Sequence, residues 1–417
     1  MNDILNQLSE MKEGDNLLSA MTELPPHSEN IRFYSASDRL MALSDIYNIY
    51  IPSSMSVEIY SKLYLALLRS LHKKRSHNAH IQRNINHKYI CRKECGGILG
   101  GSDSFTITGC SGIGKSTAIT KAIDLITAKG IIRIEKPYTK IIPFVIVQCP
   151  FDCSVKGLLI EILRKVDEAI GSDYYTKVIK SKATADMLIG CVSQVSLNHI
   201  GLLVVDEIQN VVNSKNGKSL VGMLTQLINN SGISICMVGT PESTAFFEQA
   251  MQLARRSLGL HYSVLEYDQY FYDFCKTLYS YQYTKFTAKL TDSAIRWLYE
   301  HSGGILSVVV SLIHDAQEIA ILNGTEIMNM EALNEAYQKR LAMLHGYIEP
   351  SVTRKNKTSA RDKKHNSKET EEAITDTKPL INDSESLIAD TVRESAEKDV
   401  DIITLLKKNI TVEVINL

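Results

Sequence analysis

Long apolar runs are missing from this 417-residue chain. No stretch is long enough to cross a bilayer, and the N-terminus has no signal-peptide pattern, so we expect no membrane association and a cytoplasmic location. The formal net charge is only −1. A chain this close to neutral has no overall charge that would attract nucleic acid or a membrane. Any surface that binds either of them must be a local cluster of charges. No internal repeat is evident.

Cysteine is also sparse, with eight residues in the whole chain. They are scattered through apolar segments or lie in a glycine-rich loop, which is the usage of a reduced, cytosolic protein. The pair Cys91 and Cys95, with His87 nearby, has poor spacing for a structural zinc site, and no second Cys/His pair follows closely. We therefore expect no zinc.

The most informative segment that the chain does contain is a phosphate-binding loop. Residues 109–116 read Gly-Cys-Ser-Gly-Ile-Gly-Lys-Ser, a complete G-x-x-x-x-G-K-[ST] motif between a β-prone run and a helical pattern. In this setting backbone N–H groups wrap the phosphates, Lys115 reaches the β- and γ-phosphates, and the Ser116 hydroxyl ligates Mg²⁺. The predicted nucleotide-binding residues are Gly109, Cys110, Ser111, Gly112, Ile113, Gly114, Lys115, Ser116 and Thr117.

The second half of the predicted site lies about ninety residues later. Residues 201–205 form an apolar strand that leads into the carboxylates Asp206 and Glu207. We expect Asp206 to hold Mg²⁺ through water, and Glu207 to act as the base that orients the attacking water. A third apolar strand at 233–239 leads to Thr240, a polar residue that can position the water or the γ-phosphate. The predicted cofactors are ATP and Mg²⁺.

Strand and helix patterns alternate from residue 105 to residue 239, which predicts a mostly parallel α/β sheet with helices on both faces. The pattern becomes helical near residue 267, as in a small lid. We expect five parts along the chain. They are an N-terminal arm or adaptor region at 1–50, a nucleotide-binding domain at 51–266, a helical lid at 267–349, a disordered linker at 350–401 and an apolar segment at 402–417.

Two segments leave alternatives open. An amphipathic helix at 53–71 ends in the basic cluster His72-Lys-Lys-Arg75, which is either a solvated helix end or a surface that contacts phosphates. The apolar segment at 402–417 is either a docking peptide for a partner at the end of a disordered tether or a strand that packs back on the same core.

The motifs together resemble those of AAA+ ATPases. The order and spacing of Asp-Glu-Ile-Gln at 206–209, Val-Gly-Thr-Pro at 238–241 and Leu-Ala-Arg-Arg at 253–256 are similar to those of the TnsC/TniB transposition ATPases, over roughly residues 20–345. The resemblance implies a regulatory, Mg-dependent ATPase that assembles on double-stranded DNA as a ring or helical filament. It also implies that the chain links a TniQ/TnsD-like target selector to the transposase.

The resemblance further implies roles for individual residues. Arg255 or Arg256 would complete the nucleotide site of a neighbouring protomer, as an arginine finger does. Lys156, together with Thr176 or Tyr174, would face the DNA backbone, and Lys177 would add to the local charge. Residues 303–310 read Gly-Gly-Ile-Leu-Ser-Val-Val-Val and lack the arginine that many AAA+ proteins carry there, so we expect slow hydrolysis that depends on assembly.

Two other functions remain open at this point. One is an origin-recognition or plasmid-initiator ATPase, which usually adds a winged-helix DNA module after the lid, and residues 350–417 are too polar for such a module. The other is a signalling ATPase that scaffolds proteins without binding DNA. A DNA-stimulated ATPase assay separates this last reading from the other two.

Overall fold

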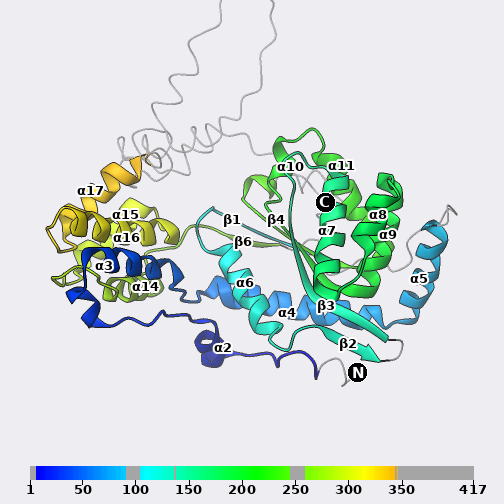
Figure 1. Ribbon diagram of the computed structural model, residues 1–417, viewed down its shortest axis with the longest axis horizontal. Helices are drawn as coiled ribbons and strands as arrows, with labels where there is room; N and C mark the ends of the chain where they lie inside the picture. The colour runs from blue at the N-terminus through cyan, green and yellow to red at the C-terminus, as the bar shows by residue number, and fades with distance from the viewer. Residues whose placement is uncertain (1–5, 91–103, 136–137, 245–258, 343–344, 346–417) are drawn as a thin grey trace, which may run out of the picture. The chain divides into compact units, whose positions relative to one another are not determined.

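The computed structural model describes residues 6–90, 104–135, 138–244, 259–342 and 345 (Figure 1). The chain divides into two units, Met1–Asn356 and Lys357–Leu417. The second unit lies wholly outside the described residues, and so do the predicted linker at 350–401 and the apolar segment at 402–417.

A six-stranded sheet lies at the centre of the α/β part, in the order β2-β3-β4-β5-β1-β6. Neighbouring strands are parallel except for β2 and β3, which are antiparallel. The strands β1, β4 and β5 are buried along almost their whole length, as expected for strands covered on both faces. The strand bounds are Phe105–Gly109 (β1), Ile132–Glu135 (β2), Tyr138–Gln148 (β3), Ile200–Asp206 (β4), Ser234–Gly239 (β5) and Leu260–Tyr262 (β6).

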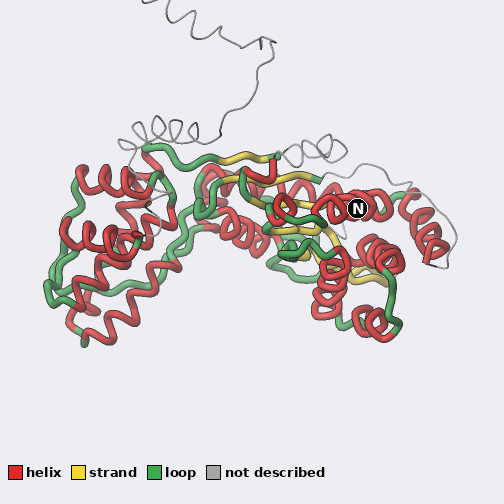
Figure 2. Tube along the Cα trace, turned by 90° about the horizontal axis from the view of Figure 1, so that it is seen from above, coloured by secondary structure: helices red, strands yellow, loops and turns green. Residues whose placement is uncertain are grey.

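Helices cover both faces of this sheet (Figure 2). Leu203 and Ile235 belong to the core on the face of α7, α9 and α11, whereas their neighbours Leu202 and Cys236 belong to the core on the face of α4 and α6. The expected α/β fold class with a P-loop is confirmed. The helix bounds are Ser54–Lys74 (α4), His77–Ile90 (α5), Lys115–Ile126 (α6), Val155–Ile170 (α7), Tyr174–Lys180 (α8), Ala185–His199 (α9), Asn210–Asn213 (α10) and Gly217–Ser231 (α11).

A separate group of helices follows the sheet. It contains α14 (Gln269–Ser280), α15 (Asp292–Ser302), α16 (Leu306–Leu322) and α17 (Met330–Arg340). These helices enclose a core of their own. All four helices lie within residues 267–349.

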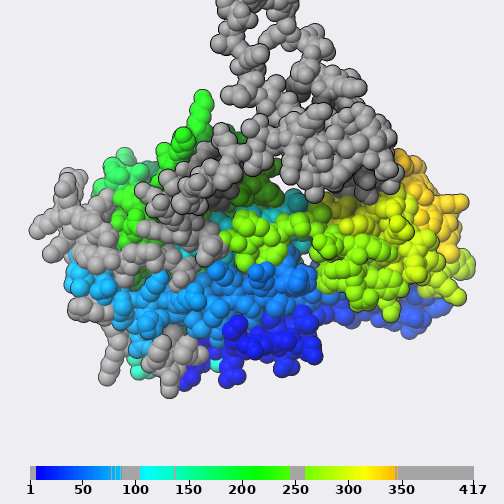
Figure 3. All heavy atoms as spheres, turned by 180° about the vertical axis from the view of Figure 1, so that it is seen from behind, coloured from blue at the N-terminus to red at the C-terminus, as the bar shows by residue number. Residues whose placement is uncertain are grey.

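The N-terminal region differs from the expected arm, because residues 6–50 pack against both cores. Leu17 and Met21, from α2 (Gly14–Met21), join the core of α4 and α6, whereas Leu43 and Ile46 join the lid core. Figure 3 shows these dark blue residues along the molecule, beside α4 and the lid helices. The remaining short elements are Glu29–Phe33 (η1), Ala36–Leu43 (α3) and Ser44–Asn48 (η2).

The basic cluster at the end of α4 is not a uniform exposed patch. Lys74 is buried, and its Nζ donates to the carbonyl oxygens of Ser196 and Leu197 at 2.6 and 3.1 Å. Burial lowers the pKa of Lys74 to about 7. Arg83 of α5 also faces inward, because its Nε donates to the Asn198 side chain at 2.9 Å. These two cations join α4 and α5 to the end of α9, so they are structural.

Among the described residues, no single helix has the length and apolar character of a membrane span. The pair Asp292–Ser302 and Leu306–Leu322 meets the length and composition criteria only when taken together, and it is bent by 119°. Both helices contribute to the lid core.

A buried ion pair joins the N-terminal segment to the lid. The Arg39 guanidinium donates to both carboxylate oxygens of Glu326, at 2.6 and 2.7 Å, and Arg39 is 1% exposed. Its Nη1 also donates to the Tyr283 carbonyl at 3.0 Å. The Arg39 hydrogen bond holds the pKa of Glu326 below its ordinary value, and Glu326 has a left-handed backbone with φ of 55°. These bonds fix residues 29–51 as part of the lid.

We predict that Arg39→Met lowers the free energy of unfolding by about 3 kcal/mol, because it leaves the buried Glu326 carboxylate with only the more exposed Lys285, at 3.5 Å, as its cation. Denaturant unfolding measures the change. Arg164→Met is the matched control, since Arg164 pairs with Glu161 and Glu168 on the surface of α7, and it should cost far less. Equal losses in the two variants would contradict a structural role for the buried pair.

Candidate functional site

The phosphate loop joins the end of β1 to the start of α6. Gly112 and Gly114 have φ angles of 81° and 95°, in the left-handed region that glycine adopts without strain. A Cβ atom on Gly109 would approach the Tyr262 carbonyl oxygen and Ile113 Cδ1 to 2.8 Å. The loop therefore needs glycine both for its turns and for its close packing on β6.

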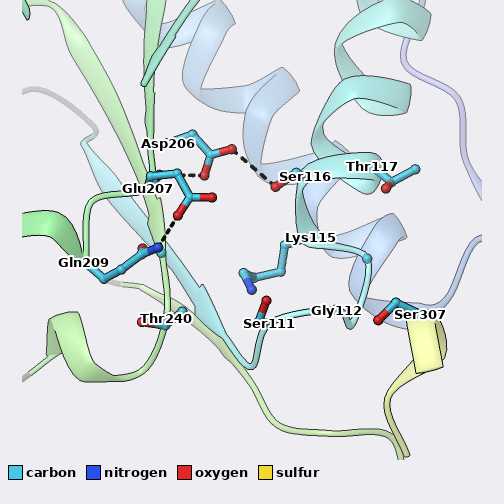
Figure 4. Close-up of a pocket in the computed structure, with 12 residues that line it drawn as sticks. Ser111, Gly112, Lys115, Ser116, Thr117, Asp206, Glu207, Gln209, Thr240 and Ser307 are labelled. Carbon is cyan, nitrogen blue, oxygen red and sulfur yellow. Dashed lines mark hydrogen bonds between the residues drawn. The ribbon is translucent and has the colours of Figure 1, made fainter. Parts of the chain in front are cut away.

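All three predicted motifs meet at one cavity (Figure 4). The carboxyl ends of parallel strands lie at one edge of a sheet, so the ends of β1, β4 and β5 bring their loops together. Of the predicted loop residues, Gly109, Cys110 and Ile113 lie outside the lining. The lining residues are Ser111, Gly112, Gly114, Lys115, Ser116, Thr117, Asp206, Glu207, Gln209, Gly239, Thr240 and Ser307.

Lys115 is held by the loop from which it comes. Its Nζ donates to the carbonyl oxygens of Gly109 and Cys110, both at 2.7 Å. Burial lowers the pKa of Lys115 below its ordinary value, and the carboxylates of Asp206 and Glu207 offset part of this effect. An anion in the cavity would supply the charge that this half-desolvated cation lacks.

Ser116 and Asp206 face each other across the cavity. The Ser116 hydroxyl donates to Asp206 Oδ2 at 3.3 Å, and Asp206 Oδ1 accepts the Glu207 backbone N–H at 2.8 Å. A hydroxyl and a carboxylate are hard oxygen ligands, the type that Mg²⁺ prefers. The residue types at this position therefore fit the predicted Mg²⁺ site.

Glu207 has a strained backbone at the end of β4. Its φ is 55°, in the left-handed region that non-glycine residues seldom adopt. Its carboxylate accepts a hydrogen bond from Gln209 Nε2, and Gln209 also lines the cavity. Such strain is often found at functional sites, where surrounding contacts maintain it. Gln209 is a site residue to which sequence reasoning assigned no role, although it stands in the Asp-Glu-Ile-Gln run.

Thr240 lines the cavity directly after β5. Its Oγ1 donates to Glu242 Oε2 at 3.0 Å. The strand β5 lies between β4 and β1 in the sheet, so Thr240 stands between the ends of the two strands that carry the main motifs.

The lid contributes a residue to this cavity that sequence reasoning did not identify. Ser307, at the start of α16, lines the cavity, and its backbone N–H donates to the Gly112 carbonyl oxygen at 3.0 Å. Ser307 lies in residues 303–310, the segment in which many AAA+ proteins carry an arginine, and this position could have indicated it. The lid thus contacts the phosphate loop through a backbone hydrogen bond.

A second, more apolar cavity adjoins the first and shares Gly112, Gly114, Thr117 and Ser307 with it. Its remaining walls come from the segment before α4, the start of α4, the lid helices α14 and α16, and Ile113 of the phosphate loop. Sequence reasoning predicted Ile113 but missed the other residues, because the segments that supply them carry no motif. The apolar and aromatic lining residues are Tyr47, Ile49, Tyr50, Ile51, Met55, Ile113, Tyr270, Phe274, Leu306 and Val310.

Comparison with known proteins finds one family to which part of this chain is similar. No curated protein matches the sequence. The model of the family "Bacterial TniB protein" matches residues 101–262, which contain the phosphate loop, Asp206, Glu207 and Thr240. This stretch is therefore similar to the TniB family. The predicted resemblance to the TnsC/TniB ATPases is therefore confirmed for it.

Several solved structures are distantly similar. The Aeropyrum pernix ORC1 protein in complex with DNA is 15% identical, with a TM-score of 0.41 over 63% of this chain and 65% of that one. The Aeropyrum pernix ORC2 protein in its ADP form is 16% identical, with a TM-score of 0.40 over 62% and 67%. A Walker-type ATPase of Pyrococcus abyssi is 11% identical, with a TM-score of 0.36 over 78% and 88%. These likenesses are too distant to assign a function.

The predicted DNA-contacting residues of the TniB-like region lie at opposite ends of α7. Lys156 is exposed in its first turn, whereas Tyr174, Thr176 and Lys177 belong to α8, which follows the last turn. At 1.5 Å per residue, α7 from residue 156 to residue 170 spans about 21 Å. The two groups therefore do not form one patch.

The residues of α8 differ in their availability. Thr176 is exposed. Lys177 forms an ion pair with Asp173 at 2.7 Å, and the Tyr174 ring packs against the core beside α7 and α9. Tyr174 also shares a hydrogen bond of 3.1 Å with His199 Nε2. Thr176 is thus the freer of the two alternatives. The candidate arginines Arg255 and Arg256 lie outside the described residues.

We predict that Gly112→Ala weakens nucleotide binding more than Gly114→Ala does. Both glycines have left-handed backbones, so both substitutions add similar strain. Only a Cβ on Gly112 collides with the lid, where it meets Ser307 Oγ and Ile305 Cγ2, whereas a Cβ on Gly114 meets nothing within 4 Å. Titration with a fluorescent ATP analogue measures both affinities. A larger loss in Gly114→Ala would show that the lid contact is unimportant for binding.

Proposed function

We propose that this chain is an ATP-hydrolysing regulator of DNA transposition that assembles on double-stranded DNA. The observation that carries the proposal is the single cavity that collects Lys115, Ser116, Asp206, Glu207 and Thr240 within a region similar to the TniB family. A cation, two hard oxygen ligands, a second carboxylate and a hydroxyl are the groups that phosphoryl transfer from ATP to water requires.

ATP occupies both cavities in this proposal. Its phosphates lie against the backbone of residues 111–117 and Lys115, at the start of α6. Ser116 and, through water, Asp206 hold Mg²⁺, which neutralises phosphate charge when it is bound. The adenine ring lies in the adjoining apolar cavity between Tyr47, Tyr50 and Tyr270, because a flat, weakly polar base suits aromatic walls.

Glu207 is the proposed base for the attacking water. The Gln209 hydrogen bond holds its carboxylate at the cavity, and Thr240 positions the water or the γ-phosphate from the end of β5. Arg255 or Arg256 of a neighbouring protomer supplies the remaining positive charge. Because Ser307 stands where the lid reaches the phosphate loop and brings no charge, turnover depends on assembly.

The proposed partners follow from the family. The chain forms a homo-oligomeric ring or filament on the DNA backbone in the bacterial cytosol, and it connects a TniQ/TnsD-like selector with the transposase. ATP hydrolysis then controls disassembly. The apolar segment at 402–417 is the proposed docking peptide for the transposase.

We predict that Lys115→Ala abolishes ATP binding, because the phosphates lose their counter-charge. Glu207→Gln should bind ATP normally and hydrolyse it at least about a hundredfold more slowly, the range expected on loss of a general base. Lys121→Ala is the control for Lys115→Ala, since Lys121 lies on the same helix and pairs with Glu23 at the surface. Nucleotide titration and phosphate release measure the two steps. Wild-type turnover by Glu207→Gln would rule out Glu207 as the base.

We also predict sequence-independent DNA binding that weakens steeply with salt, because lysine–phosphate contacts release counterions. Lys156→Ala should lower the slope of log affinity against log salt by about 0.9. Lys177→Ala should lower it less, since Asp173 already compensates that charge. Fluorescence anisotropy with two unrelated duplexes measures the slopes. A strong preference for one duplex would contradict binding through the DNA backbone alone.

A further inference from the structure

An aromatic side chain stands almost fully in solvent beside Lys156. Phe151, in the turn between β3 and α7, is 90% exposed, the largest exposure among the described large apolar residues. An isolated exposed apolar residue is common on protein surfaces. The surroundings of Phe151 distinguish it, because the turn that carries it is held rigidly and is flanked by unpaired lysines.

The turn is fixed by hydrogen bonds of its own. The Cys153 N–H donates to the Pro150 carbonyl at 2.9 Å, and the Ser154 N–H donates to Asp152 Oδ1 at 3.0 Å. Cys153 is buried, with a left-handed φ of 52°. The left-handed Cys153 adds local backbone strain to this turn, and its hydrogen bonds maintain the strain. Phe151 is exposed in the same turn.

The loop after β4 supports the same turn from the side. Asn210 Nδ2 donates to the Cys149 carbonyl at 2.9 Å. The Asp152 carbonyl accepts from Ser214 Oγ at 3.2 Å and from Asn216 Nδ2 at 3.0 Å. The β3–α7 turn and the α10–α11 junction therefore form one continuous surface.

Three lysines lie on this surface. Lys156 is in the first turn of α7, Lys215 is in the junction, and Lys218 is in the first turn of α11. All three are exposed, and none forms an ion pair with another described residue. Uncompensated cations around an exposed aromatic ring complement the polyanionic backbone and apolar sugar and base edges of a duplex.

The same surface is bonded to the proposed catalytic strand end. The Cys149 N–H donates to the Asp206 carbonyl at 2.8 Å, while the Cys149 carbonyl accepts from Asn210. The Asn210 N–H in turn donates to the Glu207 carbonyl at 3.1 Å. One residue of the turn is therefore held between the carboxylate pair and α10.

We propose that Phe151, Lys215 and Lys218 join Lys156 in a duplex-DNA contact surface, and that Asn210 couples this surface to Glu207. This inference rests on the proposed function. The lysines contact phosphates, and Phe151 contacts sugars or a base step in the minor groove without reading sequence. A shift of the turn on DNA then reaches the left-handed Glu207 through the Asn210 bonds and adjusts its carboxylate for hydrolysis.

The DNA arm of the test uses the full chain with ATP and a labelled duplex. Lys215→Ala/Lys218→Ala should lower the salt slope by about two units. Phe151→Ala should lower the affinity about tenfold with little change of slope, since the lost contact is apolar. The controls lie in the lid and should change neither quantity: Lys276→Ala/Lys289→Ala removes two exposed lysines, and Phe286→Ala removes a ring that is 63% exposed.

The coupling arm compares two asparagines of α10. Asn210→Ala should keep DNA affinity and basal ATPase activity. The factor by which DNA increases the ATPase rate should fall about fivefold or more. Asn213→Ala is the matched control, because Asn213 is exposed on the same helix. Melting temperatures of all variants check that the fold is intact.

The outcomes separate the two proposals. A wild-type chain that does not bind duplex DNA overturns the proposed function itself. A wild-type chain that binds DNA, with an unchanged slope in Lys215→Ala/Lys218→Ala, overturns only the contact surface. If Phe151→Ala weakens self-assembly and leaves DNA affinity unchanged, the Phe151 side chain contacts another protomer. Its assignment as a DNA contact is then wrong. Full DNA stimulation in Asn210→Ala overturns the coupling.

Discussion

The parallel arrangement of β3, β4, β5 and β1 is the constraint on which the rest of the structure depends. Parallel strands end at one edge of the sheet, so residues about ninety positions apart become neighbours there without any long loop. The Ser116 hydroxyl meets Asp206 only because β1 and β4 end at the same level. The register pair of Gln148 with Asp206 places the β3–α7 turn at the same edge. Nucleotide chemistry and the exposed Phe151 turn thus share one structural origin.

The sequence predicted this edge well because its signals are local. Each motif combines an apolar strand with the polar residues that follow it, and parallel βα topology then determines where those residues meet. The lid half of the site could not be predicted in this way. Tyr47 and Tyr50 reach their cavity through packing with α14 and α16, and Arg39 bonds Glu326 across 287 positions. No periodicity in residues 1–50 indicates such partners, and the described part of this region packs against both the sheet core and the lid core.

The lid contact has a consequence for how the site is completed. Ser307 offers a backbone donor to Gly112 and no charge, so the lid contacts the phosphate loop through its backbone alone at this point. The buried Arg39–Glu326 pair bonds residues 29–51 to that lid. The walls of the apolar cavity, the lid core and the Gly112 contact are therefore connected, and in the proposed function they would respond together to nucleotide.

The two sides of the sheet edge consequently have different roles. On the lid side, aromatic walls and a backbone hydrogen bond adjoin the cavity in which we propose that the nucleotide binds. On the β3 side, the Cys149 peptide is bonded both to Asp206 and to Asn210, so a force on the turn acts on the backbone that bears the carboxylates. Glu207 lies between the lid contacts and the Cys149 bonds, and its backbone is strained, with a φ of 55°. A residue already held away from its preferred conformation needs only small neighbouring shifts to change its position. This suits the proposed function, in which turnover waits for nucleotide, DNA and a neighbouring protomer.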